Sequence, residues 1–290
     1  MQLTVLSAFL SNMMGASGPL DDVSGATGGW ATRHLLSSYA GPCLRVRRSS
    51  DDTEQDIGFV GAAMDTTSLL SFVGANDGFV RTWHDQSGNA RHYQQVNNTN
   101  QPKIVNAGSL ITTIGGKPCL DFDGVDNFLA SQAAANFITT SAGTIFVVFN
   151  ADIISTNAAI AYDDDAIWGD ATSFIGAHLN NAIPTVRSMN DDGAVDHAAN
   201  TIATATSYVH IWCHRSGNIE SYITSTPTTA ASGNTGSLTN ALRVGRNYDA
   251  AGQWYDGKMT EMICYNTALS SGDLGTVAAD MAAYYGIRWS

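Results

Sequence analysis

The sequence is poor in charged residues and especially poor in glutamate. Charged residues make up 14% of the 290 positions, well below the roughly one quarter that is usual for globular domains. Only 3 of the 26 acidic residues are glutamates, and the other 23 are aspartates. Aspartate favours turns and helix caps, whereas glutamate favours helix interiors. This bias predicts many turns and little helix, and the net charge of −12 argues against nucleic acid as the main partner.

Long apolar segments, a secretory leader and a zinc motif are also missing. No apolar run reaches the ~18 residues of a membrane span, so no membrane partner is expected. The first ten residues are apolar but lack the basic start of a signal peptide. The cysteines have no CxxC spacing and no histidines at metal-ligand intervals, which argues against a zinc site. We expect small buried side chains, with disulfides between facing strands as the alternative, at Cys43, Cys119, Cys213 and Cys264.

Short apolar segments separated by turn residues fill most of the chain. About a dozen strands with turn signals predict an all-β fold, a two-sheet antiparallel jelly-roll sandwich of the concanavalin A-like kind. The segment 118–130 reads as a hairpin around Asp123-Gly124, and Asp191-Asp192-Gly193 as a second hairpin turn. The main expected strands lie at 43–48, 118–122, 128–130, 144–149, 157–162, 172–179, 184–189, 207–214, 218–224, 241–245 and 256–265.

A few short helices accompany these strands, and the chain reads as one domain. Helices are expected at 31–39, at 66–73 before Gly74, and after Ser270 up to Gly286. Residues 1–30 are rich in small side chains and predict an N-terminal arm or packing segment. Residues 31–290 are assigned to a single sandwich domain, because neither a repeat nor a long linker divides them.

The stretch from Thr82 to Gln95 reads as strand, turn and strand. Residues 80–85 alternate as a strand requires, and His92 to Gln95 resumes an extended run. Between them, Asp85-Gln86-Ser87-Gly88-Asn89 predicts a tight turn. Gly88 and Asn89 tolerate positive φ, and the Asp85 carboxylate can accept hydrogen bonds from turn amides. We therefore expect a self-bonded structural corner.

A basic cluster lies directly before an acidic one. Arg45, Arg47 and Arg48 belong to an expected strand, and Asp51, Asp52, Glu54 and Asp56 follow. Neighbouring opposite charges usually pair, so the prediction is an internal salt-bridge network. An anion-binding patch is the alternative interpretation.

Two groups of residues carry a resemblance to known families. The block Cys43–Phe59 with Trp83–Asn89 resembles the N-terminal part of family 54 α-L-arabinofuranosidase catalytic domains, and resembles more closely a segment of bacteriophage tail and virion proteins. The segments Leu120–Gly124 and Glu261–Ser270 look like the two ends of a laminin-G or concanavalin A-like jelly roll. Together the resemblance covers the chain from about residue 20 to 289.

The arabinofuranosidase resemblance implies a catalytic pair that this sequence matches incompletely. A retaining glycosidase needs two carboxyl groups about 5–5.5 Å apart. The family's nucleophile is a glutamate after paired cysteines, but the matching stretch 158–165 holds neither. The family's acid is an aspartate before an aromatic-Tyr-acid-Gly strand start, which Trp254–Gly257 matches. Asn247 or Asp249 would take the acid's position, and asparagine cannot do that chemistry.

Several other residues are candidate sites. Asp163, Asp164 and Asp165 suggest calcium, although a solvated acidic loop explains them equally simply, and no other cofactor is expected. Sugar stacking is the functional interpretation for aromatic side chains, and core filling is the structural one. The histidines, including His84 beside Asp85 and the pair His210 and His214, are interpreted as satisfied strand residues. The candidate ligand-binding residues are Trp168, Asn247, Tyr248, Asp249 and Trp254.

The main functional prediction is a non-catalytic structural or adhesive virion protein, a capsid decoration or tail subunit. It rests on the phage resemblance and on the missing glutamate at the expected active site. Its partners would be other virion proteins, further copies of the chain in a homo-oligomer such as a trimer, and a cell-surface glycan. The expected location is the virion surface. The alternatives are a carbohydrate-binding module and a family 54-like arabinofuranosidase.

Overall fold

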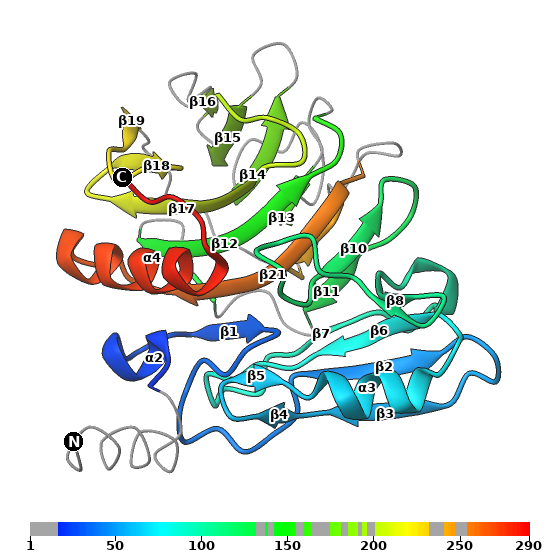
Figure 1. The fold of residues 1–290 in the computed structure, drawn as a ribbon. Helices are drawn as coiled ribbons and strands as arrows, with labels where there is room; N and C mark the ends of the chain where they lie inside the picture. The colour runs from blue at the N-terminus through cyan, green and yellow to red at the C-terminus, as the bar shows by residue number, and fades with distance from the viewer. Residues whose placement is uncertain are drawn as a thin grey trace, which may run out of the picture.

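The computed structural model is an antiparallel β-sandwich with the C-terminal helix packed on the outer face of one layer (Figure 1). It describes residues 17–131, 137–138, 142–154, 201–231, 241–246 and 254–290, together with the backbone of four strands at 159–163, 175–180, 185–190 and 193–195. The all-β sandwich predicted from the turn-rich sequence is confirmed. None of the described helices is long and apolar enough to cross a membrane.

The first layer runs through ten strands, each paired antiparallel with the next. In spatial order they are β3 (Glu54–Ile57), β2 (Leu44–Arg48), β6 (Gly78–Trp83), β7 (Tyr93–Gln94), β11 (Leu129–Ser131), β20 (Arg243–Val244), β13 (Ala159–Asp163), β14 (Ile175–Asn180), β15 (Thr185–Asn190) and β16 (Gly193–Val195).

The second layer is built around two long strands in its centre. Its order is β19 (Thr228–Ala231), β18 (Asn218–Tyr222), β17 (Ser207–Arg215), β12 (Gly143–Ala151) and β21 (Asp256–Tyr265). The outer edge of β21 pairs with β10 (Leu120–Asp123) and β1 (Gly28–Ala31). The two layers are joined by β8 (Lys103–Asn106), which pairs with β6, β10 and β9 (Ser109–Leu110).

Alternation along β12 separates two apolar cores. All nine of its residues are buried. Ile145, Val147 and Phe149 belong to the core between the layers. Phe146 and Val148 belong to a second core that includes side chains of α4 (Ser271–Tyr285). This period of two explains why an uninterrupted apolar run forms a central strand rather than an amphipathic one.

The remaining elements are short. They are α2 (Pro19–Asp22), α3 (Thr66–Val73), the 3-10 turn η1 (Asn98–Asn100) and the ribbon of β4 (Phe59–Val60) and β5 (Ala63–Met64). The predicted helices at 66–73 and after Ser270 are confirmed. Ser270 accepts a hydrogen bond from the Asp273 amide at 3.1 Å, and Gly286 ends α4 in the left-handed conformation, φ 64°.

The predicted helix at 31–39 is wrong. Several backbone groups of this segment bond to other segments, as in Thr32 N to Thr260 O and His34 N to Ala62 O, and the one bond within it, Tyr39 N to Leu36 O, makes a turn rather than a helix. The described part of the predicted N-terminal arm, residues 17–30, packs as part of the sandwich, with Trp30 fully buried. The domain boundary at residue 30 stays a prediction.

The predicted hairpin at 118–130 is also wrong. β10 and β11 do not pair with each other, because β10 joins β21 in one layer and β11 joins β7 and β20 in the other. The turn between them holds Asp123, whose Oδ1 accepts from the amides of Val125, Asp126 and Asn127. This turn therefore carries the chain between layers. The second predicted hairpin is supported, since β15 and β16 pair across residues 191–192.

Candidate active site

The backbone places the end of β13 in the middle of the first layer. Asp163, the last residue of β13, lies opposite Arg243 of β20 and opposite Gly176 of β14. β13 and β14 are consecutive in the chain, whereas β20 lies about 80 residues further on, so only the fold brings Arg243 beside Asp163. Of the three predicted calcium ligands, Asp163 is placed by its backbone, and Asp164 and Asp165 lie outside the described residues.

The two residues that flank the segment 247–253 pair with each other just after β20. Arg246 and Trp254 form an isolated antiparallel bridge. Gly245, directly before it, has φ 90°, and a Cβ there would lie 2.5 Å from the Phe122 ring. Only glycine fits this position. The predicted site residues Asn247, Tyr248 and Asp249 belong to the bridged segment and lie outside the described residues, as does Trp168.

An aromatic and arginine cluster surrounds this bridge, and we call it the Trp254 cluster. The Arg246 guanidinium lies 4.6 Å from the Trp254 ring centre and 5.0 Å from that of Phe128. Arg243 lies 6.0 Å from the Phe128 ring. Because these cation–π contacts hold Trp254 half-buried at the sheet, one ring face is already covered. This arrangement leaves less of Trp254 for the predicted sugar stacking.

An acidic group lies beside the Trp254 cluster. Asp256 stands directly opposite Asp123 in the pairing of β21 with β10. Burial, and then the nearby charge of Asp152, raise the pKa of Asp256. Lys258 counters this charge by ion pairs with Asp152 and, at 3.1 Å, with Asp121. A carboxyl group that holds its proton more tightly is suited to donate one.

The Asp85 turn (Trp83–Asn89) is structural, as the sequence predicts. The Asp85 carboxylate accepts four hydrogen bonds, from Gly29 N, Ser87 N, Ser87 Oγ and Arg91 N, at 2.9–3.0 Å. The Gln86 side chain accepts from Leu35 N and donates to Ala31 O and Arg33 O. Gly88 has positive φ, but the second such residue is Ala90 rather than Asn89. The turn joins β6 to the N-terminal strand.

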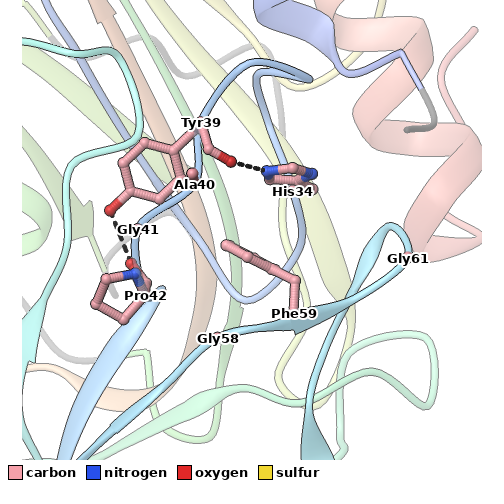
Figure 2. Close-up of a pocket in the computed structure, with 8 residues that line it drawn as sticks. All are labelled: His34, Tyr39, Ala40, Gly41, Pro42, Gly58, Phe59 and Gly61. Carbon is pink, nitrogen blue, oxygen red and sulfur yellow. Dashed lines mark hydrogen bonds between the residues drawn. The ribbon is translucent and has the colours of Figure 1, made fainter. Parts of the chain in front are cut away.

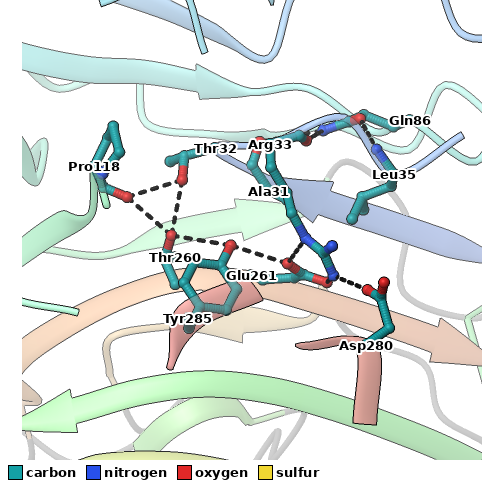
Figure 3. Close-up of polar contacts among 10 residues, drawn as sticks. All are labelled: Ala31, Thr32, Arg33, Leu35, Gln86, Pro118, Thr260, Glu261, Asp280 and Tyr285. Atoms are coloured by element: carbon teal, nitrogen blue, oxygen red, sulfur yellow. Dashed lines mark hydrogen bonds and ion pairs between the residues drawn. The ribbon is translucent and has the colours of Figure 1, made fainter. Parts of the chain in front are cut away.

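A second closed polar group, the Arg33–Glu261 network, holds α4 against the sheet (Figure 3). Arg33 donates to the two Glu261 carboxylate oxygens at 2.6 and 2.9 Å, and Tyr285 Oη donates to Glu261 Oε2 at 2.9 Å. Asp280 of α4 also pairs with Arg33. Burial alone would lower the pKa of Arg33, but the adjacent Glu261 carboxylate raises that pKa above its usual value. Glu261 has no exposed surface, so it is not available to a substrate.

The other two glutamates are paired as well. Glu54 lies 3.2 Å from Arg81, and Glu220 accepts from Arg215 at 3.0 Å and from Tyr222 at 2.7 Å. All three glutamates of the chain thus have structural partners. Of the three, Glu261 is buried, Glu220 is half-buried and Glu54 is exposed.

The described histidines differ in how their ring nitrogens are satisfied. His84 and His92 meet edge to face at 4.8 Å. Burial, and then the neighbouring His92, lower the pKa of His84 to about 4. His210 lies 3.2 Å from Ser188 and Ser221 as a satisfied buried residue. The prediction is wrong for His214, because neither of its ring nitrogens has a partner in the described part of the chain.

The basic cluster forms the predicted salt bridges. Arg45 pairs with Asp56 at 2.7 Å, Arg47 with Asp52 at 2.6 Å and Arg48 with Asp51 at 2.6 Å. The four cysteines are free and buried, so the predicted small buried side chains are confirmed and the disulfide alternative is excluded. Within the described ranges, no group of three or more His, Cys, Asp or Glu side chains is arranged to hold a metal ion.

Comparison with known proteins identifies one enzyme family. A family model described as "Alpha-L-arabinofuranosidase B, catalytic" matches residues 25–122. Probable α-L-arabinofuranosidases B from Aspergillus flavus and Aspergillus terreus are 24% identical over 87% and 97% of this chain. The chain spans 59% and 65% of their lengths.

Solved structures agree on the fold. A GH54 α-L-arabinofuranosidase soaked with a cyclic sulfate inhibitor superimposes with a TM-score of 0.67 at 14% identity, covering 92% of this chain and 65% of that one. An arabinofuranosidase complexed with arabinofuranosyl-α-1,2-xylobiose gives a TM-score of 0.65 at 16% identity, with the same coverage. The similarity to family 54 predicted from residues 43–59 and 83–89 is confirmed.

These comparisons contradict the main functional prediction. The family model, the curated relatives and the structures name an arabinofuranosidase rather than a non-catalytic virion protein. The predictions of no enzyme activity and of virion partners in a homo-oligomer are therefore wrong. The error came from giving weight to the missing glutamate, although an aspartate is chemically able to replace it. The location at the virion surface stays a prediction.

Proposed function

We propose that this chain is a glycoside hydrolase that removes α-L-arabinofuranosyl groups from a glycan. The observation that carries the proposal is the agreement of the family match at 25–122 with a superposition over 92% of the chain. The glycan is then the partner of this protein. We also propose that the sandwich is related to the concanavalin A-like jelly rolls.

We propose that the nucleophile is one of the aspartates 163–165 that end or follow β13, and that the acid belongs to the segment between β20 and β21. The nucleophile would be Asp163, Asp164 or Asp165, at the end of β13, because every glutamate is paired elsewhere. The acid would be Asp249, since the only other candidate at that position, Asn247, has no proton to donate. The pairing of Asp163 with Arg243 and the bridge of Arg246 with Trp254 support this assignment.

Aspartate reaches one methylene less far than glutamate. A nucleophile of this kind attacks the anomeric carbon while the acid protonates the leaving oxygen, and the two carboxyl groups lie about 5–5.5 Å apart. The shorter side chain therefore requires the substrate to sit closer to the backbone of β13. We expect a smaller or more selective pocket than a glutamate nucleophile would allow.

Hydrolysis of an aryl α-L-arabinofuranoside tests the proposal. The chain should release the aryl alcohol, and the first sugar product observed by NMR should retain the anomeric configuration. Asp249→Asn and one of Asp163→Asn, Asp164→Asn and Asp165→Asn should each lower kcat about 10²- to 10⁴-fold. The matched control is Asp22→Asn, an exposed acid beside α2, which should keep the full rate.

The same variants distinguish catalysis from calcium binding at Asp163–Asp165. If these acids bind calcium, EDTA should lower the melting temperature, and each Asp→Asn change should abolish that response. If they are catalytic, EDTA should change neither rate nor melting temperature. No turnover by the folded chain, or equal turnover in all variants, would contradict the proposed function.

A further inference from the structure

A pocket lies at the β3 end of the first layer, away from the candidate active site in the middle of that layer. It has a volume of about 350 Å³ and is open to solvent. Its walls come from the segment before β2 and the segment between β3 and β5 (Figure 2). β2, β6, β7 and β11 lie between β3 and β20 in the sheet. At about 4.8 Å per strand, the two sites are roughly 24 Å apart.

Rings form the walls of this pocket. The His34 and Phe59 rings lie 4.5 Å apart at 32°, and Tyr39 meets Phe59 at a steep angle with centres 6.4 Å apart. Figure 2 shows the Tyr39 and His34 side chains on opposite sides of the space, with Phe59 and Pro42 below. All four residues are half-buried, so each exposes part of its surface to the pocket.

Internal hydrogen bonds fix these rings before any ligand binds. Tyr39 Oη donates to Pro42 O at 2.8 Å, and His34 Nε2 lies 2.7 Å from Tyr39 O. These contacts use Tyr39 Oη and His34 Nε2. Preorganised aromatic walls lower the entropy cost of binding.

The lining has no formal charge apart from what His34 can carry. The remaining lining residues are Ala40, Gly41, Gly58 and Gly61. In a chain of net charge −12, a site without acids or bases gives no advantage to an ionic ligand. Flat apolar ring faces with a few polar groups suit a neutral sugar ring, whose C–H face stacks while its hydroxyl groups form hydrogen bonds.

We propose that the pocket bounded by His34, Tyr39 and Phe59 is a secondary binding site for a neutral sugar residue of the glycan substrate. The identity of that sugar as an arabinofuranosyl unit rests on the proposed function. The site holds the polymer while a distant branch occupies the active site. It therefore affects polymer hydrolysis and not hydrolysis of a small substrate.

Gly58 offers a way to block the pocket without disturbing the fold. It lines the pocket, its φ is not positive, and a Cβ built on it meets nothing within 4 Å. Gly58→Leu should therefore fill the space without strain. Phe59→Ala removes the stacking surface, and Val60→Ala is the matched control, because Val60 is 67% exposed and does not line the pocket.

The test is a titration with arabinotriose in an Asp249→Asn background, followed by calorimetry or amide NMR. Gly58→Leu and Phe59→Ala should weaken binding at this site about tenfold or more, and Val60→Ala should leave it unchanged. In the unmodified background, Gly58→Leu should raise KM for arabinan at least threefold and change kcat/KM for the aryl arabinofuranoside less than twofold.

The possible results separate this inference from the proposed function. Equal arabinotriose binding in Gly58→Leu and in the parent would overturn the inference, even if the aryl substrate is hydrolysed. Binding of phenol without binding of arabinotriose would overturn it too, since the pocket would then be merely apolar. Binding of arabinotriose that Gly58→Leu abolishes, in a chain without hydrolytic activity, would support the pocket and contradict the proposed function alone.

Discussion

Asp85 and Asp256 are both aspartates beside a long strand, yet they have opposite surroundings. Asp85 is 1% exposed and accepts four hydrogen bonds. Asp256 is half-buried and is close to the acids Asp152, Asp121 and Asp123, which help to raise its pKa. A buried acid whose acceptors are all used holds structure together, whereas an acid among like charges costs stability. The second kind is found near the Trp254 cluster, where we place catalysis.

The resemblance at 83–89 therefore reflects the folding of the sandwich rather than its chemistry. Asp85 and Gln86 tie the turn to the backbone of residues 29–35. The Arg33–Glu261 network connects the same segment to α4. We call the Asp85 turn and this network together the closed region. Variants in the closed region should change stability and leave the rate per folded molecule intact.

Arg33→Met should have the largest effect in the closed region. It leaves the Glu261 carboxylate buried without its cation, which typically costs about 3–5 kcal/mol of unfolding free energy. The measurement is urea unfolding followed by tryptophan fluorescence. Arg45→Met is the control, because the Arg45–Asp56 pair is exposed and should contribute less than about 1 kcal/mol.

The double variant Arg33→Met/Glu261→Leu sharpens this result. Replacing both partners by apolar side chains removes the unpaired charge, so most of the lost stability should return. A single variant that costs less than about 1 kcal/mol would mean that water reaches Glu261 and that the region is not closed.

Asp85→Asn should have the next largest effect. The new amide nitrogen replaces one carboxylate oxygen, so the Arg91 and Ser87 donors that it faced lose an acceptor. We expect a loss of about 2–3 kcal/mol in the same urea assay. The kcat for the aryl arabinofuranoside, corrected for the folded fraction, should stay within twofold. A tenfold lower kcat in fully folded protein would instead assign the turn to the active site.

Local sequence signals predicted the elements whose partners are close in the chain. The α4 cap at Ser270, the end of α3 at Gly74 and the pairing of Arg45 with Asp56 all depend on residues within about a dozen positions. The helix predicted at 31–39 failed because the segment pairs with other parts of the chain, 28 positions away for His34 with Ala62 and 228 for Thr32 with Thr260. No local pattern reports such pairing.

The candidate site was predictable only in pieces. The family resemblance singled out the stretches 158–165 and 247–249, but neither suggested that β13 and β20 are neighbours. The pocket at His34, Tyr39 and Phe59 was not predicted. His34 and Tyr39 form one of its walls, and the sequence had assigned both to a helix at 31–39. The pairing of each glutamate with a basic side chain also had no signal beyond their small number.

Asp256→Asn should have the smallest effect and the opposite sign. Removing one charge from directly opposed aspartates should stabilise the fold by roughly 0.2–1 kcal/mol at pH 7. The pKa of Asp256 is higher in the folded state than in the unfolded state. The wild-type protein therefore loses stability as the pH rises from the unfolded-state pKa of Asp256 through its folded-state pKa. The gain should therefore be present at pH 7 and vanish near pH 3 in parallel urea titrations. If Asp256→Asn destabilises the chain at pH 7, the carboxylate has a partner like those of Asp85, and the contrast between the two aspartates fails.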